Sequence, residues 1–137
     1  MNEEQIARRW FEQGWNERDE SVVDELMAPD AVGHMAHGRT ESRDAFKLVR
    51  AAFLTAFPDL HLEVEEVVTA PGCAAVRWRF TGTHAGEGFE LAPTGEEVTL
   101  RGTSWLHVRD GRLSEGWDTW DMGTLFARLR AVAEGEA

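Results

Sequence analysis

The segment 117–121, which reads WDTWD, contains the side chain with the clearest potential for chemistry, Asp118. On a β-strand Asp118 and Trp120 face one side of the sheet, whereas Trp117 and Thr119 face the other. An indole beside a carboxylate lowers its hydration, and this raises the pKa toward the range where one group can accept and return a proton. Asp118 is therefore our candidate general acid/base, with Trp120 as a flat apolar wall for a ligand.

Structural roles compete with this interpretation. Asp118 could cap a helix or pair with an arginine, although placing a carboxylate in an apolar strand segment is costly and favours function. Asp121 directly precedes Met122 and Gly123, where a helix can begin. We therefore expect Asp121 to be a helix N-cap rather than a second catalytic residue.

His84 is the second candidate catalytic residue, because it ends a row of alternating apolar side chains that includes Trp78 and Phe80. It could donate a hydrogen bond to a developing oxyanion, or as imidazolium it could hold Asp118 ionised. A hydrogen bond from His84 to a loop carbonyl is the structural alternative. Trp78, which shares this face, is expected to form another wall of the ligand site.

His34 and His37 have the His-x-x-His spacing that could begin a metal site, but no third ligand is evident nearby. We therefore expect no metal, and we expect both histidines to line or cover the mouth of a ligand site. Phe53 lies at helical spacing with other aromatic residues, so it should belong to the core first and to the ligand site second. Trp15 fits either position, and we include both among the candidate substrate-binding residues.

Helical patterns precede strand patterns along the chain. Apolar residues at helical spacing predict a helix reaching Gly14, a short one capped by Ser21, and a third between Ser42 and Pro58. The polar segment 30–40 is expected to be a loop with short extended pieces. Four segments rich in Val, Trp, Thr and Phe are expected to be strands: His61–Thr69, Cys73–His84, Glu97–Arg109 and Arg112–Asp121. A last helix is expected at Met122–Val132.

This order predicts an α+β fold in which a long, curved antiparallel sheet wraps around the N-terminal helices and forms a cone. The open mouth of such a cone suits a small molecule. With 137 residues, 42% hydrophobic and 28% charged, the chain has the composition of one globular domain over residues 1–137.

The charge balance and the cysteine content exclude several classes of partner and site. Acidic residues outnumber basic ones by 25 to 14, and the net charge of −11 argues against a nucleic-acid partner and against an anionic membrane surface. Cys73 is the only cysteine, so no intrachain disulfide can form. No signal-peptide pattern is evident at the N-terminus, and we expect a cytoplasmic protein.

Several short segments, taken in order, resemble the SnoaL-like polyketide cyclase family of the nuclear-transport-factor-2-like superfamily. They are Phe57-Pro58-Asp59-Leu60, Thr81-Gly82-Thr83-His84, Pro93-Thr94-Gly95, Gly102-Thr103-Ser104, Asp110-Gly111-Arg112-Leu113 and the segment 115–121. The resemblance extends roughly from Arg8 to Leu129. It implies an α+β cone, no cofactor, and a homodimer or higher homo-oligomer built through the outer face of the sheet.

The resemblance also implies an intramolecular, aldol-type ring closure of a hydrophobic, carbonyl-bearing small molecule. Asp118 matches the acid/base of the family, and His84 matches its pocket histidine. A carboxylate can remove a proton from a carbon between two carbonyls and return it to the new alcohol. The alternatives are a non-catalytic protein that binds a hydrophobic ligand, or a hydroxylase, epoxide hydrolase or isomerase on the same fold; the absence of tyrosine counts against an epoxide hydrolase.

Overall fold

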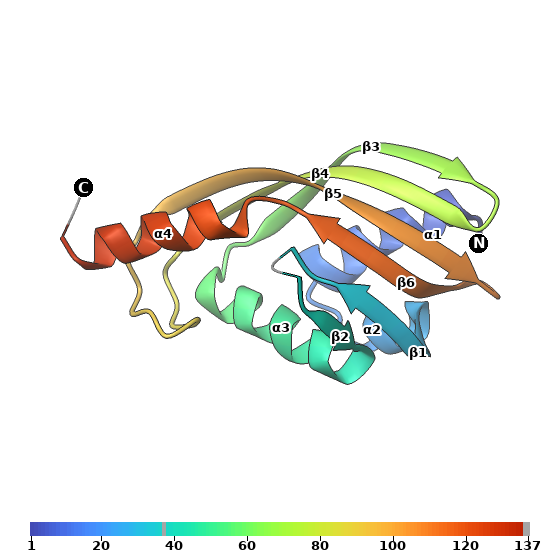
Figure 1. The fold of residues 1–137 in the computed structure, drawn as a ribbon, viewed down its shortest axis with the longest axis horizontal. Helices are drawn as coiled ribbons and strands as arrows, with labels where there is room; N and C mark the ends of the chain where they lie inside the picture. Colours follow the sequence, from blue (N-terminus) through green and yellow to red (C-terminus); the bar gives the residue numbers. More distant parts are fainter. Residues whose placement is uncertain (37, 136–137) are drawn as a thin grey trace.

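The computed structural model describes residues 1–36 and 38–135 and confirms the predicted α+β architecture. A curved six-stranded sheet with strand order β2-β1-β6-β5-β4-β3 arches over the N-terminal helices and α3, and α4 extends beyond one end of the sheet (Figure 1). The helices are α1 (Glu3–Arg9), η1 (Trp10–Asn16), α2 (Ser21–Leu26), α3 (Arg43–Ala56) and α4 (Met122–Ala133). No helix in the described part of the chain is long and apolar enough to cross a bilayer.

The four predicted long strands are all present and form an antiparallel meander. They are β3 (His61–Ala70), β4 (Cys73–Thr83), β5 (Glu97–Arg109) and β6 (Arg112–Thr119). Inward residues of β4 are buried, and its outward Arg77 and Arg79 form ion pairs with Glu66 and Glu63 of β3. This alternation gives the sheet one apolar face for the helices and one polar face.

The prediction of a loop over residues 30–40 was wrong in part. Strand β1 (Met27–His34) pairs in parallel with β6, and β2 (Thr40–Ser42) pairs antiparallel with β1. Pro29 lies in β1, where the register with β6 shifts between Met27 and Val32. Proline has no N–H for a ladder hydrogen bond, and it is tolerated at such an irregularity.

The predicted N-terminal helix continues as a π-helix from Trp10 to Asn16. The Glu17 N–H donates to the Glu12 carbonyl, five residues back, at 3.0 Å. The wide π turn brings two tryptophans five residues apart onto one face, where Trp10 and Trp15 both contact Phe46 of α3.

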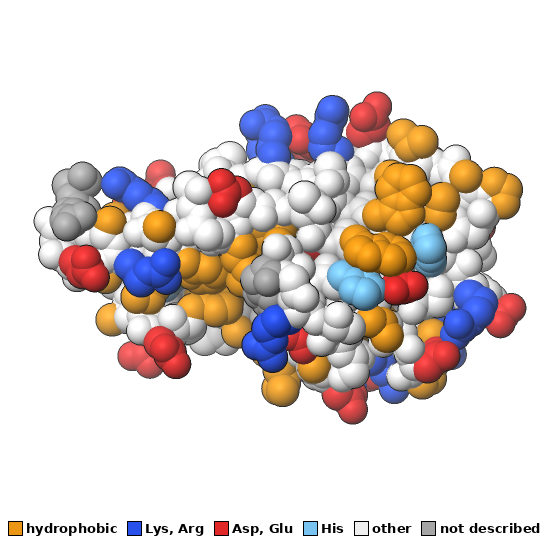
Figure 2. Space-filling model, in the orientation of Figure 1, with side chains coloured by type: hydrophobic (Ala, Val, Ile, Leu, Met, Phe, Trp, Pro, Cys, Tyr) orange, Lys and Arg blue, Asp and Glu red, His pale blue; other side chains and the backbone are white. Residues whose placement is uncertain are grey.

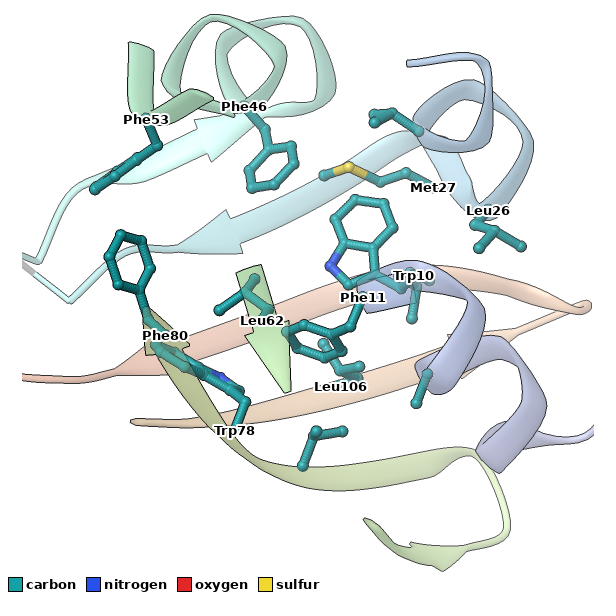
Figure 3. Packing of buried hydrophobic residues seen from close by; sticks show 14 of the residues in the cluster. Trp10, Phe11, Leu26, Met27, Phe46, Phe53, Leu62, Trp78, Phe80 and Leu106 are labelled. Atoms are coloured by element: carbon teal, nitrogen blue, oxygen red, sulfur yellow. The ribbon is translucent and has the colours of Figure 1, made fainter. Parts of the chain in front are cut away.

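The hydrophobic core fills the space between the concave face of the sheet and the helices. Figure 3 shows Phe46 and Phe53 of α3 pointing toward the region occupied by Trp78 and Phe80 of β4. The core is not filled completely, because a cavity remains between these aromatic side chains.

Candidate active site

The cavity lies between the concave face of the sheet, η1 and α3, and has a volume of about 100 Å³. Its walls are mostly aromatic and include Trp15, Phe46, Phe53, Trp78, Phe80 and Trp120. The polar side chains of Ser104 and Asp118 also line it. The site is thus an apolar hollow that contains a carboxyl group, which is the environment expected from the sequence around Asp118.

Asp118 is held by a short chain of hydrogen bonds across three strands. Its partner in the β5–β6 register is Ser104, whose hydroxyl donates to Asp118 Oδ1 at 2.6 Å. The indole Nε1–H of Trp78, on β4, donates to the same Ser104 Oγ at 3.0 Å. Because the indole can only donate, it occupies an acceptor position of Ser104 and leaves the hydroxyl proton for Asp118.

Two effects act in opposite directions on the pKa of Asp118. Desolvation in the apolar cavity raises it and is the larger effect, whereas the hydrogen bond from Ser104 lowers it. The net result is a pKa above the ordinary aspartate value. A carboxyl group with a raised pKa is a stronger base when ionised and holds a proton at a higher pH, as general acid/base chemistry requires.

Gly102 allows Trp78 to take its position. It is the direct partner of Trp78 in the β4–β5 register, and a Cβ atom there would lie 2.5 Å from two Trp78 ring atoms. The same Cβ would lie 2.9 Å from the Thr119 carbonyl oxygen. Neither the indole ring nor the backbone can move away easily, so Gly102 helps to set the hydrogen bonds that reach Asp118.

The predicted alternation along β6 is confirmed. Asp118 and Trp120 both line the cavity, and the Trp120 ring contacts Trp78 and Phe53 at centroid distances of 6.5 and 5.8 Å. Trp117 lies on the opposite face, stacked on the His34 ring at 4.9 Å. Four of the proposed substrate-binding residues therefore meet Asp118 at one cavity: Trp15, Phe53, Trp78 and Trp120.

His84 is fully buried but is not among the residues that line this cavity. Its Nδ1 accepts the Thr94 N–H at 3.2 Å, and Thr94 Oγ1 lies 2.9 Å from the same nitrogen. Its ring packs against Phe57, and its Nε2 has no hydrogen-bond partner among the described residues. Burial lowers the pKa of His84, which favours a neutral ring. The structure does not bring His84 and Asp118 together.

His34 points to the outer side of the sheet rather than into the cavity. Its Nε2 lies 2.7 Å from the Glu115 carboxylate. His37, the other histidine expected at the mouth, lies outside the described residues. Among residues 1–36 and 38–135, no group of three or more potential ligands could hold a metal ion.

Asp121 is the N-cap of α4, as predicted. Its carboxylate accepts the Thr124 N–H at 2.9 Å and the Thr124 hydroxyl at 2.6 Å. These two hydrogen bonds hold the pKa of Asp121 below its usual range. The two neighbouring aspartates therefore have pKa values shifted in opposite directions, and only Asp118 has the shift that suits proton transfer.

Sequence reasoning missed Ser104 and Gly102. Both lie on the inward face of β5, where two small residues precede Leu106. A small residue opposite a predicted inward tryptophan is a usable signal, because a bulky side chain needs space on the neighbouring strand. The hydrogen bond from Ser104 to Asp118 depends on the strand register, which the sequence alone does not specify.

Comparison with known proteins gives the family and the fold of the chain. Residues 5–129 match a family model described as SnoaL-like polyketide cyclase. No protein of curated function matches the sequence.

Solved structures share the fold over nearly the whole chain. AclR from Streptomyces galilaeus, a candidate hydroxylase, is 30% identical with a TM-score of 0.83, over 93% of this chain and 80% of that one. IdmH from Streptomyces antibioticus, a candidate polyketide cyclase, is 28% identical with a TM-score of 0.82, over 95% and 99%. A candidate SnoaL-like polyketide cyclase from Jannaschia sp. CCS1 has a TM-score of 0.85 over 93% and 90%, but at 23% identity it supports the fold alone.

Proposed function

The chain belongs to the SnoaL-like polyketide cyclase family, and on this basis we propose that it catalyses an aldol-type ring closure with Asp118 as general acid and base. The substrate would be a hydrophobic molecule with several carbonyl groups. The observation that carries the proposal is a carboxyl group of raised pKa, held by Ser104 and surrounded by aromatic walls.

The proposed reaction begins at a carbon flanked by two carbonyl groups. The C–H bond breaks, the proton moves to the Asp118 carboxylate, and the electron pair delocalises onto a carbonyl oxygen as an enolate. The enolate carbon then forms a C–C bond with a second carbonyl carbon of the same molecule. The oxygen of that carbonyl takes the proton back from Asp118 and becomes an alcohol, so one residue serves both transfers.

The remaining residues of the cavity bind the substrate and position Asp118. The aromatic walls favour a planar, partly folded chain through offset and edge contacts. The Ser104 hydroxyl fixes the Asp118 carboxyl group by donating a hydrogen bond to Oδ1. We assign no proton transfer to His84, because its side chain does not line the cavity.

A hydroxylase is the second candidate function, favoured by the 30% identity with AclR. An enolate carbon formed at Asp118 could form a C–O bond with dioxygen instead of a C–C bond with a second carbonyl. Protonation gives a hydroperoxide, and loss of water from it breaks the O–O bond and leaves a carbonyl group, so dioxygen is the oxidant and no reductant is needed. The two reactions share the first proton transfer and differ in their need for oxygen. An assay under strict exclusion of oxygen separates them: the cyclase continues, whereas the hydroxylase stops.

The test of the first step uses an ester of benzoylacetate, whose central carbon lies between a ketone and an ester carbonyl. In D₂O the native protein should accelerate deuterium incorporation at this carbon, followed by NMR. Asp118→Asn should lower the accelerated rate by on the order of 100-fold or more. Asp110→Asn, at the turn of the same hairpin, is the matched control and should keep the native rate. Undiminished exchange by the Asp118 variant would show that another group is the base, and no exchange by any form would favour a ligand-binding protein.

A further inference from the structure

The cavity beside Asp118 has few side chains that can donate a hydrogen bond to a bound molecule. Apart from carboxyl groups, the described residues that line it and carry such a donor are Ser104 and four tryptophans: Trp10, Trp15, Trp78 and Trp120. Ser104 already donates to Asp118, and Trp78 already donates to Ser104. Three indole N–H groups therefore remain for a ligand.

Trp10 is the most deeply buried of these three tryptophans. It is 8% exposed, whereas Trp15 and Trp120 are half-buried. None of the hydrogen bonds within residues 1–36 and 38–135 involves Trp10 Nε1. Nor is this atom one of the unpartnered nitrogens that are enclosed on all sides, so it borders open space. For a side chain that is almost wholly buried and lines the cavity, that open space is the cavity itself.

The orientation of the indole agrees with this conclusion. Figure 3 shows the Trp10 nitrogen on the side of the ring that faces Leu62 and Phe80, away from Leu26. Leu62 and Phe80 line the cavity, whereas Leu26 does not. The ring is held by Phe46 of α3, at a centroid distance of 5.3 Å. Close packing of this kind fixes the rotamer, so the N–H is directed into the cavity before a ligand arrives.

An unpaired donor in an apolar cavity needs an explanation, because buried polar groups are almost always hydrogen-bonded. Asp118 supplies the complementary group. Its Oδ1 accepts from Ser104, and no residue in the described part of the chain donates to its Oδ2. The cavity has a volume of about 100 Å³, less than the roughly 150 Å³ of an apolar cavity that binds benzene. A carbonyl-bearing group that fills it therefore lies within reach of both Asp118 and Trp10.

We infer that the Trp10 Nε1–H donates a hydrogen bond to the substrate oxygen on which the enolate charge develops. The inference rests on the proposed function, in which Asp118 removes the proton. As the C–H bond breaks, the proton moves to Asp118 and the electron pair delocalises onto the oxygen. Trp10 keeps its own proton, and its hydrogen bond strengthens as the oxygen becomes negative. Trp10 is thus a catalytic residue that stabilises charge, whereas Asp118 transfers the proton.

Trp10→Phe removes the N–H donor and keeps an aromatic ring. We expect deuterium exchange into the benzoylacetate ester to slow by on the order of 100-fold, the usual effect of losing one oxyanion donor. The loss should fall on kcat with little change in KM, because the hydrogen bond is strongest in the transition state. The pH midpoint of exchange should stay native, since Asp118 sets it. Trp105→Phe, at an exposed indole on the opposite face of the sheet, is the matched control and should keep the native rate.

A planar diketone tests charge stabilisation without turnover. 1,3-Indanedione ionises to an enolate that absorbs differently from the neutral form, so absorbance gives the ratio of the two forms in the bound state. The test uses Asp118→Asn, whose amide is uncharged like the protonated carboxyl group. At a fixed pH the ratio of enolate to neutral diketone should be on the order of tenfold higher in Asp118→Asn than in Asp118→Asn/Trp10→Phe. Indane, which has the same ring frame without oxygen, measures the effect of altered packing alone.

NMR of the ¹⁵N-labelled indoles tests the hydrogen bond with Trp10 left in place. In Asp118→Asn the Trp10 Nε1–H resonance should move downfield when 1,3-indanedione binds, and it should not do so with indane. An unresponsive resonance, an equal enolate ratio in the two variants, or native exchange or a shifted pH midpoint in Trp10→Phe would each overturn the inference. Native exchange by Asp118→Asn would instead refute the proposed base, and the enolate ratio would still report on Trp10.

Discussion

The proposed chemistry depends on how three side chains share two hydrogen bonds. Trp78 donates to Ser104, and Ser104 donates to one oxygen of Asp118. The arrangement orients the carboxyl group and partly stabilises its ionised form. The surrounding aromatic walls act in the opposite direction and have the larger effect on its pKa. The site therefore keeps a carboxyl group where ionisation is unfavourable, and that cost appears in the stability of the protein.

Asp118→Asn should make the protein more stable at neutral pH. Burial raises the pKa of Asp118 above its unfolded value of about 3.9, so the stability that this group contributes is complete below pH 3.9 and is lost as the pH rises through the higher folded pKa. Asparagine carries no charge and can still accept the hydrogen bond from Ser104.

Thermal unfolding measured from pH 3 to pH 8 tests this prediction. The melting temperature of the Asp118 variant should exceed that of the native protein by a few degrees at pH 7, and the difference should disappear toward pH 3. Asp110→Asn, whose carboxylate is exposed, should show no such divergence. A variant that is less stable than the native protein at pH 7 would contradict the desolvation argument.

At the scale of elements, the β4–β5 pair places the tryptophan that holds the site. Trp78 of β4 lies directly opposite Gly102 of β5, and its ring covers the position that a Cβ atom would take. The indole reaches Ser104, two residues further along β5, from this position. The β4–β5 register therefore determines where the Trp78 indole lies and which hydroxyl it can reach.

Gly102→Ala should displace Trp78 and weaken the hydrogen bonds to Ser104 and Asp118. We expect a loss of about 1–3 kcal/mol in unfolding free energy, the usual cost of overpacking, together with slower deuterium exchange. Urea unfolding and the exchange assay measure the two effects. Gly14→Ala is the control, since a Cβ there would meet only a Val22 methyl at 3.9 Å. Native stability and exchange in Gly102→Ala would contradict the proposed positioning role.

The strand pattern predicted from the sequence located the sheet and the inward face of Asp118, but it could not locate Ser104. The Asp110-Gly111 turn pairs Arg109 with Arg112, and continuing that register would place Ser104 opposite Trp117. A bulge after His107 shifts the pairing by one residue and places Ser104 opposite Asp118. A bulge of this kind leaves little trace in a hydrophobic pattern. A register shift of one residue nevertheless changes which side chains of the two strands lie opposite each other on the same face.

The position of His84 shows a different limit of sequence reasoning. Its predicted inward face is correct, since it is buried together with the inward residues of β4. However, Trp78 and His84 are six residues apart, which is about 20 Å along an extended strand. Alternation identifies the face of a sheet but not the position along it, so His84 supports a loop rather than the cavity.

At the scale of the whole molecule, an apolar row crosses the outer face of the sheet. Consecutive strand partners form it, in the order His34, Trp117, Trp105, Ala75 and Val68. Trp105 is 51% exposed and Val68 is 62% exposed. Figure 2 shows hydrophobic side chains next to two histidines over this part of the sheet. An exposed row of this kind is typical of an interaction surface.

Charges beside this row are balanced, although the chain as a whole carries −11. Arg77, Arg79 and Arg101 on the outer face each form an ion pair with a glutamate of β3. These ion pairs reduce like-charge repulsion between two copies that meet at this face. We propose that a second copy of the chain covers it, in agreement with the homo-oligomer expected from the sequence.

Trp105→Glu tests this assembly. Two introduced carboxylates in an apolar interface would be desolvated without partners, so the variant should be a monomer at concentrations where the native protein has at least twice the chain mass. Light scattering coupled to size exclusion gives the masses. Leu48→Glu, at an exposed leucine of α3, is the matched control and should keep the native mass. A native protein that is itself a monomer would refute the proposal.

Trp120 lies between the cavity at Asp118 and an open surface hollow lined by Phe89, Met122 and Phe126. The two differ in how well they tolerate substitution. The inner cavity is built largely from buried core side chains, where most substitutions weaken folding. The surface hollow is built from exposed and half-exposed residues of the loop 85–95 and α4, where substitutions are tolerated better. Substitutions at the surface hollow should therefore cost the fold less than substitutions around Asp118.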